Sequence, residues 1–277
     1  MEKIKLGKSG LLVPPIALGC MRLTGAERTQ ADAFLHTALE LELNFFDHAD
    51  IYGGGACERV FGEMIKDAGV RREDLIIQSK CAIVPGNMYD FSKEHILSAV
   101  DGSLKRLGTD YLDVLLLHRP DALMEPEEVA EAFDELEKSG KVRHFGVSNE
   151  DPYTMELLQS ALHQPICANQ LQMSLTNATM IAQPMNTNIC DGLNPVLDNG
   201  VLNYCRLHNI TIQTWSPFQY GFFEGVFIGS EKYPKLNAKL DELAKKYNVT
   251  NTAIALAWIL RHPAKMQAVI GTINPKR

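Results

Sequence analysis

The chain contains 277 residues, of which 45% are hydrophobic and 22% are charged, and its formal net charge is −7. A chain of this length and composition can bury a large core without disulfides or structural metals. Its negative charge argues against nucleic acid as the main partner, because phosphate binding requires clustered Lys and Arg. The sequence also shows no apolar run as long as a membrane span and no N-terminal signal peptide.

The six cysteines are scattered, and none of them forms a CxxC pair. Reduced thiols explain this pattern better than a disulfide framework, which a protein of this size does not need. We therefore expect a soluble, cytoplasmic protein with no membrane partner.

Short apolar runs alternate with amphipathic stretches along most of the chain. The apolar runs predict eight buried strands, at Ile16–Cys20, Asn44–Asp47, Leu75–Ser79, Leu112–Leu117, His144–Val147, Ala168–Leu171, Thr211–Thr214 and Ala268–Ile270. The amphipathic stretches predict helices, including Gln30–Leu43, Cys57–Ala68, Lys93–Leu107, Pro126–Ser139 and Lys235–Lys246. Eight strands alternating with helices indicate an α/β fold, a (β/α)8 TIM barrel formed by residues 1–277 as one domain. An open doubly wound sheet is the alternative, but no Gly-rich dinucleotide turn follows the first strand.

Three segments depart from this alternation. Lys3–Leu6 and Leu11–Pro14 flank a Gly-Lys-Ser-Gly turn, which predicts an N-terminal β-hairpin that closes the bottom of the barrel. Residues 177–200 are rich in Asn, Pro and Gly, whereas residues 217–234 contain six aromatic side chains. Loops this long are more often functional lids than simple connections, so we expect both at the C-terminal face. Disorder is the alternative for the first loop, and the aromatic residues argue against it for the second.

Polar residues stand at the carboxyl end of most predicted strands. They are Asp47, Lys80, His118, Ser148, Asn149, Gln170, Trp215, Ser216, Gly271 and Thr272. Each has an ordinary structural explanation when taken alone: Asp47 as a helix cap, Lys80 as a surface lysine, and His118 as a hydrogen-bonded core histidine. In a parallel barrel, however, all these ends meet on the face where barrel enzymes keep their active sites. Their joint placement therefore predicts one polar pocket.

The segments around these residues resemble the aldo-keto reductase superfamily. Asn44–Gly53 resembles the signature in which an Asp precedes the catalytic Tyr by five positions. Leu75–Lys80 resembles the strand that ends in the catalytic Lys, and Tyr111–His118 resembles the strand that ends in the active-site His. Gly140–Asn149, Asn169-Gln170 and Trp215-Ser216-Pro217 then follow in the family's order. Any one of these motifs is weak evidence, but the ordered set is specific.

The resemblance implies an NADPH-dependent oxidoreductase that reduces a small aldehyde or ketone to an alcohol, with Tyr52 as the general acid. A free phenol has a pKa of about 10, which is high for an acid that works near neutrality. We expect the Lys80 ammonium to lower the pKa of Tyr52 and Asp47 to hold Lys80 in place. His118 either orients the substrate carbonyl or helps to pass the proton.

The resemblance also implies contacts with NADP(H). Ser148, Asn149 and Gln170 correspond to the residues that bind the nicotinamide carboxamide, and Trp215 to the aromatic that stacks on its ring. The remaining positions implied at the cofactor are Ser216, Phe218, Gly271, Thr272, Arg277, Cys20 and Met21. An Arg at position 277 suits the 2′-phosphate and favours NADPH, because a guanidinium forks onto phosphate. Many relatives have Lys where this chain has Gly271, so use of both cofactors remains open.

The family continues for a further helix or two beyond the last cofactor motif, so we expect that a C-terminal tail is missing after Arg277. We expect a monomer or a weak homo-oligomer and assign no metal ligands. Two other functions stay open: a metal-dependent barrel hydrolase, which needs at least three placed ligands, and a non-catalytic NADPH sensor. Bound zinc would favour the first, and cofactor binding without turnover would favour the second.

Overall fold

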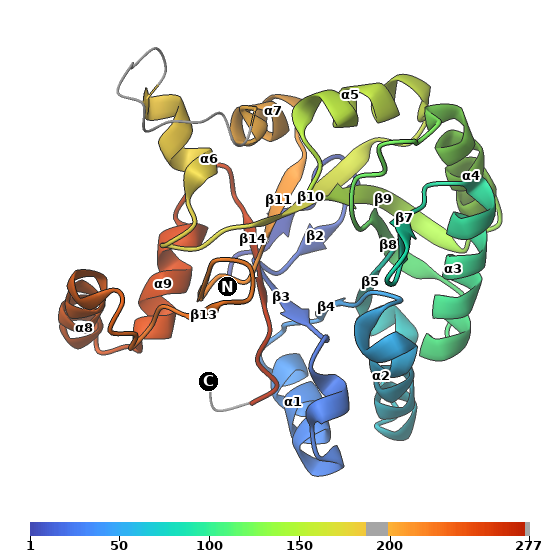
Figure 1. The fold of residues 1–277 in the computed structure, drawn as a ribbon. Coiled ribbons are helices and arrows are strands. Elements are labelled where there is room, and N and C mark those ends of the chain that lie inside the picture. Colours follow the sequence, from blue (N-terminus) through green and yellow to red (C-terminus); the bar gives the residue numbers. More distant parts are fainter. Residues whose placement is uncertain (187–198, 275–277) are drawn as a thin grey trace.

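A computed structural model describes residues 1–186 and 199–274 and forms a closed barrel of eight parallel strands (Figure 1). The order around the barrel is β10, β11, β14, β3, β4, β5, β8 and β9. Their bounds are β3 Ile16–Gly19, β4 Phe45–Asp47, β5 Ile76–Cys81, β8 Leu112–Leu117, β9 Val142–Ser148, β10 Ile166–Gln172, β11 Thr211–Trp215 and β14 Gln267–Ile270. The predicted TIM barrel and its eight strands are confirmed, with small differences at the strand ends.

Helices cover the outside of the barrel. Their bounds are α1 Arg28–Glu40, α2 Ala56–Asp67, α3 Lys93–Leu107, α4 Pro126–Lys138, α5 Pro152–Ala161, α6 Thr179–Ala182, α7 Val201–His208, α8 Pro234–Tyr247 and α9 Asn251–Leu260. The five predicted helices are confirmed, whereas the shorter α5, α6, α7 and α9 were not predicted. Within the described ranges, no helix is long and apolar enough to cross a membrane.

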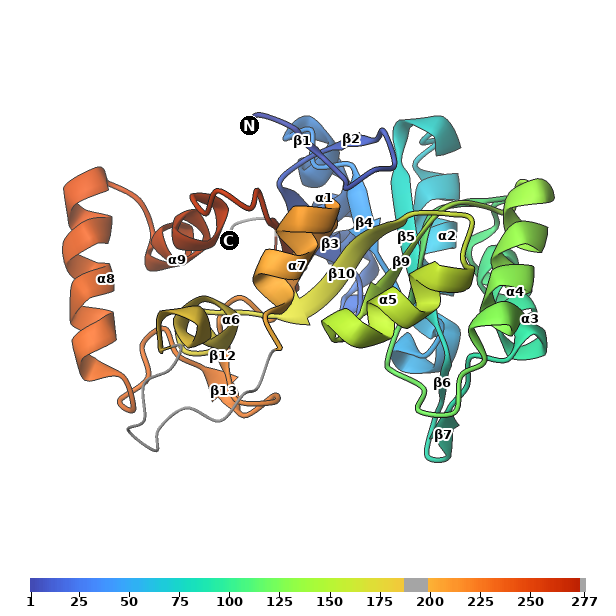
Figure 2. The same cartoon turned by 90° about the horizontal axis from the view of Figure 1, so that it is seen from above.

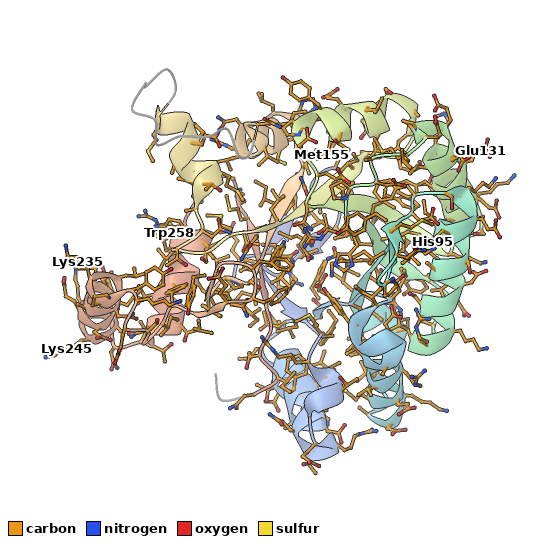
Figure 3. The ribbon with its side chains drawn as sticks, viewed as in Figure 1. His95, Glu131, Met155, Lys235, Lys245 and Trp258 are labelled. Carbon is orange, nitrogen blue, oxygen red and sulfur yellow. The ribbon has the colours of Figure 1, made fainter. Side chains whose placement is uncertain are left out.

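Helix α8 stands farther from the barrel than the other helices. Figure 2 shows α9 between α8 and the strands, and the contacts follow the same order, α8 on α9 and α9 on β14. Lys235 and Lys245 lie on the outer side of α8 (Figure 3), while Leu240 is buried. The amphipathic sequence of α8 therefore seals a small satellite core rather than the barrel itself.

The two long loops differ from each other. The first, expected at residues 177–200, begins with the helix α6 and the 3-10 helix η4 Gln183–Asn186, so the prediction of an irregular segment is wrong there. Its middle, residues 187–198, lies outside the described residues. The second loop folds into an antiparallel pair, β12 Gln219–Tyr220 with β13 Gly225–Val226. Phe227 is completely buried next to it in a cluster with Leu240 and Ala255, whereas Phe222 and Phe223 at the tip of the loop are exposed.

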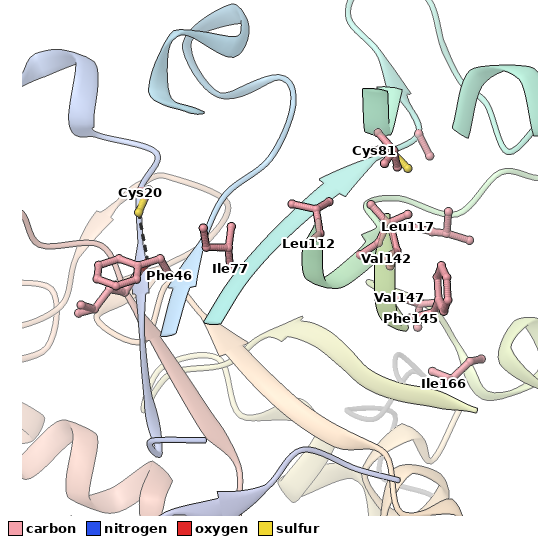
Figure 4. Packing of buried hydrophobic residues seen from close by; sticks show 14 of the residues in the cluster. Cys20, Phe46, Ile77, Cys81, Leu112, Leu117, Val142, Phe145, Val147 and Ile166 are labelled. Atoms are coloured by element: carbon pink, nitrogen blue, oxygen red, sulfur yellow. Dashed lines mark hydrogen bonds between the residues drawn. The ribbon is translucent and has the colours of Figure 1, made fainter. Parts of the chain in front are cut away.

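The side chains of the barrel strands alternate between two buried layers. Residues of one parity, such as Leu117, Phe145 and Val147, point outward into the main core that the helices cover (Figure 4). Residues of the other parity, such as Phe45 and Leu116, point inward. Because both faces are buried, the strands read as continuous apolar runs in the sequence.

The lower part of the barrel interior is apolar and is closed by the N-terminal hairpin. The hairpin consists of β1 Ile4–Lys5 and β2 Leu12–Val13, as predicted. Leu6 and Val13 are fully buried against inward-pointing residues, and the backbone N–H of Gly7 donates to Thr211 Oγ1 at 2.8 Å. The hairpin therefore acts as a plug at the N-terminal end of the barrel, opposite the strand ends that carry the polar residues.

Gly7 is predicted to be essential to this plug. Its φ of +51° is unfavourable for other residues, and a Cβ there would overlap the carbonyl oxygen of Cys167. We expect Gly7→Ala to lower the free energy of unfolding by about 3 kcal/mol, from backbone strain and overpacking together. Gly10→Ala is the matched control, because Gly10 has a φ of +81° but no atom lies within 4 Å of the place that an added methyl group would take. It should lose only about 1 kcal/mol. Equal losses in chemical denaturation would show that the plug tolerates the extra carbon.

Candidate active site

A buried ion pair joins the ends of β4 and β5. The two strands are adjacent and parallel, with Asp47 paired to Gln78, so that Asp47 and Lys80 point into the same part of the barrel. Both side chains are almost completely buried, and Lys80 Nζ lies 2.8 Å from the Asp47 carboxylate. Lys80 also donates to the carbonyl oxygen of His48 at 2.7 Å. A buried ammonium requires such partners, because removing it from water is otherwise very costly.

Tyr52 completes a cluster with this pair. It begins the 3-10 helix η2 Tyr52–Gly55 after β4, and its hydroxyl lies 3.1 Å from Lys80 Nζ. Burial raises the pKa of Tyr52, and the nearby Lys80 ammonium opposes that rise without cancelling it. Lys80 therefore lowers the pKa of Tyr52 as expected, but burial outweighs this effect, so the pKa lies above the ordinary value of a phenol. Its phenol remains protonated near neutral pH, as a proton donor must be.

The pKa of Lys80 is raised although the group is buried. Burial alone lowers the pKa of a lysine, but Asp47 and Tyr52 both favour the charged form and outweigh it. Lys80 therefore keeps a positive charge beside the phenol over the whole neutral range. Lys80 is therefore a charged ammonium group, and the adjacent Tyr52 is a neutral hydroxyl group.

His118 lies on the other side of Tyr52. It follows the last residue of β8, and its ring meets the Tyr52 ring edge to face at a centroid distance of 6.0 Å. Burial lowers its pKa well below the ordinary value, and the charges of Lys80 and Arg119 lower it further. The imidazole is therefore neutral, so it can donate one hydrogen bond to a carbonyl but does not carry a spare proton at neutral pH.

Four of the predicted cofactor residues form a hydrogen-bonded chain beside this cluster. Ser148 Oγ donates to the carbonyl oxygen of Gln170 at 3.0 Å, and Asn149 Nδ2 donates to Ser148 Oγ at 2.8 Å. Asn149 also donates to the carbonyl oxygen of His118 at 3.2 Å and accepts from Trp215 Nε1 at 3.1 Å. The structure therefore brings these residues together with Asp47, Lys80, Tyr52 and His118 at one end of the barrel.

The chemistry of these groups fits a nicotinamide. No described residue donates to Gln170 Oε1, so this oxygen can accept from an amide such as the carboxamide. The partly exposed Trp215 ring provides an aromatic surface, with Phe222 and Phe223 at centroid distances of 6.0 and 6.1 Å. The Arg119 guanidinium lies 6.0 Å from the Trp215 ring centroid, so a positive charge borders this aromatic surface.

Four other predicted cofactor residues follow the ends of β11 and β14. Ser216, Phe218, Gly271 and Thr272 are each partly exposed near the strand ends. Arg22 Nη1 donates to the carbonyl oxygen of Gly271 at 2.8 Å, and a Cβ at position 271 would come equally close to that nitrogen. The guanidinium thus occupies space that a longer residue at position 271 would need. Arg277 lies outside the described residues.

The turn after β3 shows one departure from the predicted site. Met21 is 39% exposed, whereas Cys20 is fully buried in the outer core, where its thiol contacts the carbonyl oxygen of Leu18 at 3.5 Å (Figure 4). The backbone N–H of Cys20 donates to the carbonyl oxygen of Asp47 at 2.9 Å. The geometry does not support a cofactor contact by the Cys20 side chain, because strand alternation turns it outward.

The residues within ranges 1–186 and 199–274 include no group of three His, Cys, Asp or Glu arranged to hold a metal ion. His48, next to Asp47, points outward and packs against Phe61 at a ring distance of 4.6 Å. Burial and the Lys80 charge lower its pKa to about 3. This environment is that of a neutral core histidine, as strand alternation predicts.

Glu150 is a buried carboxyl group that the sequence did not indicate. It follows Asn149, is 1% exposed, and has no hydrogen-bond partner for either carboxylate oxygen among the described residues. Burial raises its pKa to about 8, with smaller contributions from Asp151 and Asp121. A glutamate after a strand end usually lies in solvent, so no pattern in the sequence distinguishes this position.

Glu150 should make the stability of the protein depend on pH. The folded protein keeps a proton up to about pH 8 that the unfolded chain, with a pKa of 4.5, has already released. Stability therefore falls as pH rises through this window. We expect Glu150→Gln to be more stabilising at pH 7.5 than at pH 5, by about 3 kcal/mol. The exposed Glu128→Gln controls for the change in net charge. An equal effect of Glu150→Gln at both pH values would contradict the buried, protonated state.

Known proteins resemble this chain in both sequence and fold. The model of the Aldo/keto reductase family matches residues 15–277. The chain is 36% identical over 255 residues to 6-dehydroglucose reductase of Agrobacterium fabrum, and the alignment covers 88% of this chain and 78% of that protein. It is 34% identical over 283 residues to oxidoreductase YdhF of Escherichia coli, and the alignment covers 98% of this chain and 88% of that protein. A solved aldo/keto reductase from Klebsiella pneumoniae in complex with NADP and acetate matches with a TM-score of 0.77 at 26% identity, over 100% of this chain and 87% of that one. The chain belongs to the aldo/keto reductase family.

Proposed function

We propose that this protein reduces a small aldehyde or ketone to an alcohol with NADPH, and that Tyr52 is the general acid. One observation carries the proposal: the Tyr52 hydroxyl lies 3.1 Å from a buried Lys80 ammonium that is paired with Asp47. Such a cluster of mutually perturbed titratable groups at the C-terminal end of a barrel is typical of an acid-base site. The membership in an oxidoreductase family supports the same reading.

The residues of this cluster perform the proton half of the reduction. A bound dihydronicotinamide supplies a hydride to the carbonyl carbon, and the carbonyl oxygen then requires a proton. Tyr52 donates its hydroxyl proton to that oxygen, and the O–H bond of the phenol breaks as the alcohol O–H bond forms. Lys80 stabilises the phenolate that remains, because its ammonium is already within hydrogen-bond distance.

The neutral His118 has a separate task in this proposal. It donates a hydrogen bond to the substrate oxygen and so fixes the carbonyl between its ring and Tyr52. Because the pKa of His118 is lowered well below its ordinary value, it orients the carbonyl rather than passing a proton. Positioned acid-base catalysis contributes about 10²–10⁴-fold, so alignment and electrostatics supply much of the remaining acceleration.

Ser148, Asn149, Gln170 and Trp215 are the residues that we propose hold the nicotinamide. Ser216, Phe218, Gly271, Thr272 and Met21 contribute further contacts, and Arg277 binds the 2′-phosphate. The Klebsiella relative, which was solved with NADP, supports NADP(H) as the cofactor. Arg22, beside Gly271, adds a cation on the same side of the barrel.

Three broader parts of the proposal rest on other observations. We place the protein in the cytoplasm because the described cysteines, all buried, are free thiols. Residues 1–277 form one domain in this view, and the protein works as a monomer or a weak homo-oligomer. Its substrate is a small carbonyl compound, and 6-dehydroglucose is a first choice because the Agrobacterium relative is named after it.

Tyr52→Phe is expected to abolish the reduction while leaving the cofactor bound. The change removes the donated proton but keeps the ring, so kcat should fall by about 10²–10⁴-fold. Turnover is measured as NADPH oxidation with 6-dehydroglucose and a panel of aldehydes, and NADPH affinity by fluorescence. Tyr153→Phe, on the exposed side of α5, is the matched control and should keep full activity. Retained activity in Tyr52→Phe would remove Tyr52 from its assigned role.

Arg277→Ala is expected to separate the two dinucleotides. The guanidinium contacts a phosphate that only NADPH carries, so its loss should raise the Kd for NADPH by about tenfold and leave the Kd for NADH nearly unchanged. Both constants can be measured by quenching of the protein's tryptophan fluorescence. A parallel weakening of both dinucleotides would place Arg277 away from the 2′-phosphate.

A further inference from the structure

Four glutamine side chains cross the barrel interior directly beneath the ion pair. They come from four different strands: Gln78 from β5, Gln170 from β10, Gln213 from β11 and Gln267 from β14. All four are buried, with exposures of 3% or less. Inward-facing positions of such barrels are usually filled by branched apolar side chains. A buried amide layer is costly unless its members satisfy one another, so its arrangement requires an explanation.

The hydrogen bonds of this layer converge on Asp47 and Gln213. Gln78 Nε2 donates to Asp47 Oδ1 at 2.6 Å and to Gln213 Oε1 at 2.9 Å. Gln170 Nε2 donates to the same two oxygens, at 2.9 and 3.1 Å. Each of these amides therefore divides its two N–H groups between the carboxylate and Gln213. No N–H of either amide is left over.

The amide nitrogen of Gln213 is also fully hydrogen-bonded. Its Nε2 donates to Gln78 Oε1 at 3.0 Å and to Gln267 Oε1 at 2.8 Å. Gln267 Nε2 then donates to the backbone carbonyl of Pro14 at 2.8 Å, which follows the N-terminal hairpin. One continuous chain of amides thus runs from the plug of the barrel to the catalytic carboxylate.

We propose that Gln213 is a positioning residue of the active site, which rests on the function proposed above. By accepting one N–H from Gln78 and one from Gln170, it directs the second N–H of each amide onto Asp47. If either amide turned over, its oxygen would face the Asp47 carboxylate and repel it. The two correctly aimed donors fix the carboxylate, and the carboxylate fixes Lys80 beside Tyr52.

The same arrangement determines what Gln170 offers to the cofactor. Because both of its N–H groups are engaged inside the barrel, Gln170 presents only its Oε1 outward. It can therefore accept a hydrogen bond from the carboxamide N–H but cannot donate to the carboxamide oxygen. Gln213, which contacts neither the substrate nor the nicotinamide in this scheme, thus affects both the ion pair and the orientation of Gln170.

The test compares Gln213→Met with Gln164→Met in the full chain. Methionine keeps the length of the side chain and removes every hydrogen bond. Gln164 is a matched control, because it is also buried and donates to two carboxylates, Asp134 and Glu137, but lies outside the barrel interior. We expect kcat to fall by about tenfold in Gln213→Met with the KM for the carbonyl changed less than twofold, since the ion pair is misplaced while the substrate pocket is not. Gln164→Met should keep both constants. An unchanged kcat in Gln213→Met, or an equal loss in both variants, would overturn the proposal.

A second measurement needs neither cofactor nor turnover. In cofactor-free protein labelled with 15N at the glutamine side chains, the amide hydrogens of Gln78 and Gln170 should exchange slowly with solvent. Gln213→Met should accelerate the exchange of both by at least about tenfold, because each loses an acceptor. Unchanged exchange rates would refute the orienting role even if the wild-type protein proved to be inactive. Inactive wild-type protein with the expected exchange would instead refute only the proposed function.

Gln78→Met keeps the proposal testable if Gln213→Met does not fold. It removes one donor to Asp47 and leaves the bond from Gln170 to Gln213 in place. We expect a smaller fall in kcat, about threefold, while the amide hydrogens of Gln170 stay protected. A wild-type kcat in this variant would show that Asp47 does not depend on the amide layer.

Discussion

The ammonium group of Lys80 has no exposure to solvent, and this constraint shapes the upper part of the barrel. A charge in that position is stable only with a carboxylate and further polar atoms around it, which Asp47, the His48 carbonyl and the Tyr52 hydroxyl provide. The β4–β5 pairing sets the first of these contacts, since it places the two side chains on one face of adjacent parallel strands. The short turn after β4 then returns Tyr52 to the same ammonium.

The barrel interior changes in character from one end to the other. Its lower part is apolar and closed by the hairpin, its middle is a layer of glutamine amides, and its upper part holds the charges and Tyr52. This order separates the parts that hold the fold together from the part in which we propose that the chemistry takes place. It also gives the Asp47 carboxylate a rigid polar support, because side chains packed from below have little freedom to reorient.

The sequence was sufficient for the architecture, and it indicated which polar side chains meet at one end of the barrel. Strand-helix alternation predicts the barrel, and the barrel rule places Asp47, Lys80 and His118 at one face because each ends a strand. The amide layer was missed although a signal existed: Gln78, Gln213 and Gln267 interrupt apolar strands. Recognising that they bond to each other requires the strand order and register, which bring residues 54 to 135 positions apart into contact. The direction of the Tyr52 pKa was also beyond the sequence, because it depends on how far burial outweighs a neighbouring charge.

A crystal structure of the protein with bound NADP+ tests the central claim most directly, because it locates the hydride-bearing carbon relative to Tyr52. The account predicts that the nicotinamide ring lies on Trp215 with this carbon facing the Tyr52 hydroxyl, and that Lys80 remains paired with Asp47 beneath it. A nicotinamide bound away from Tyr52, or a Lys80 that has left the phenol, would contradict it.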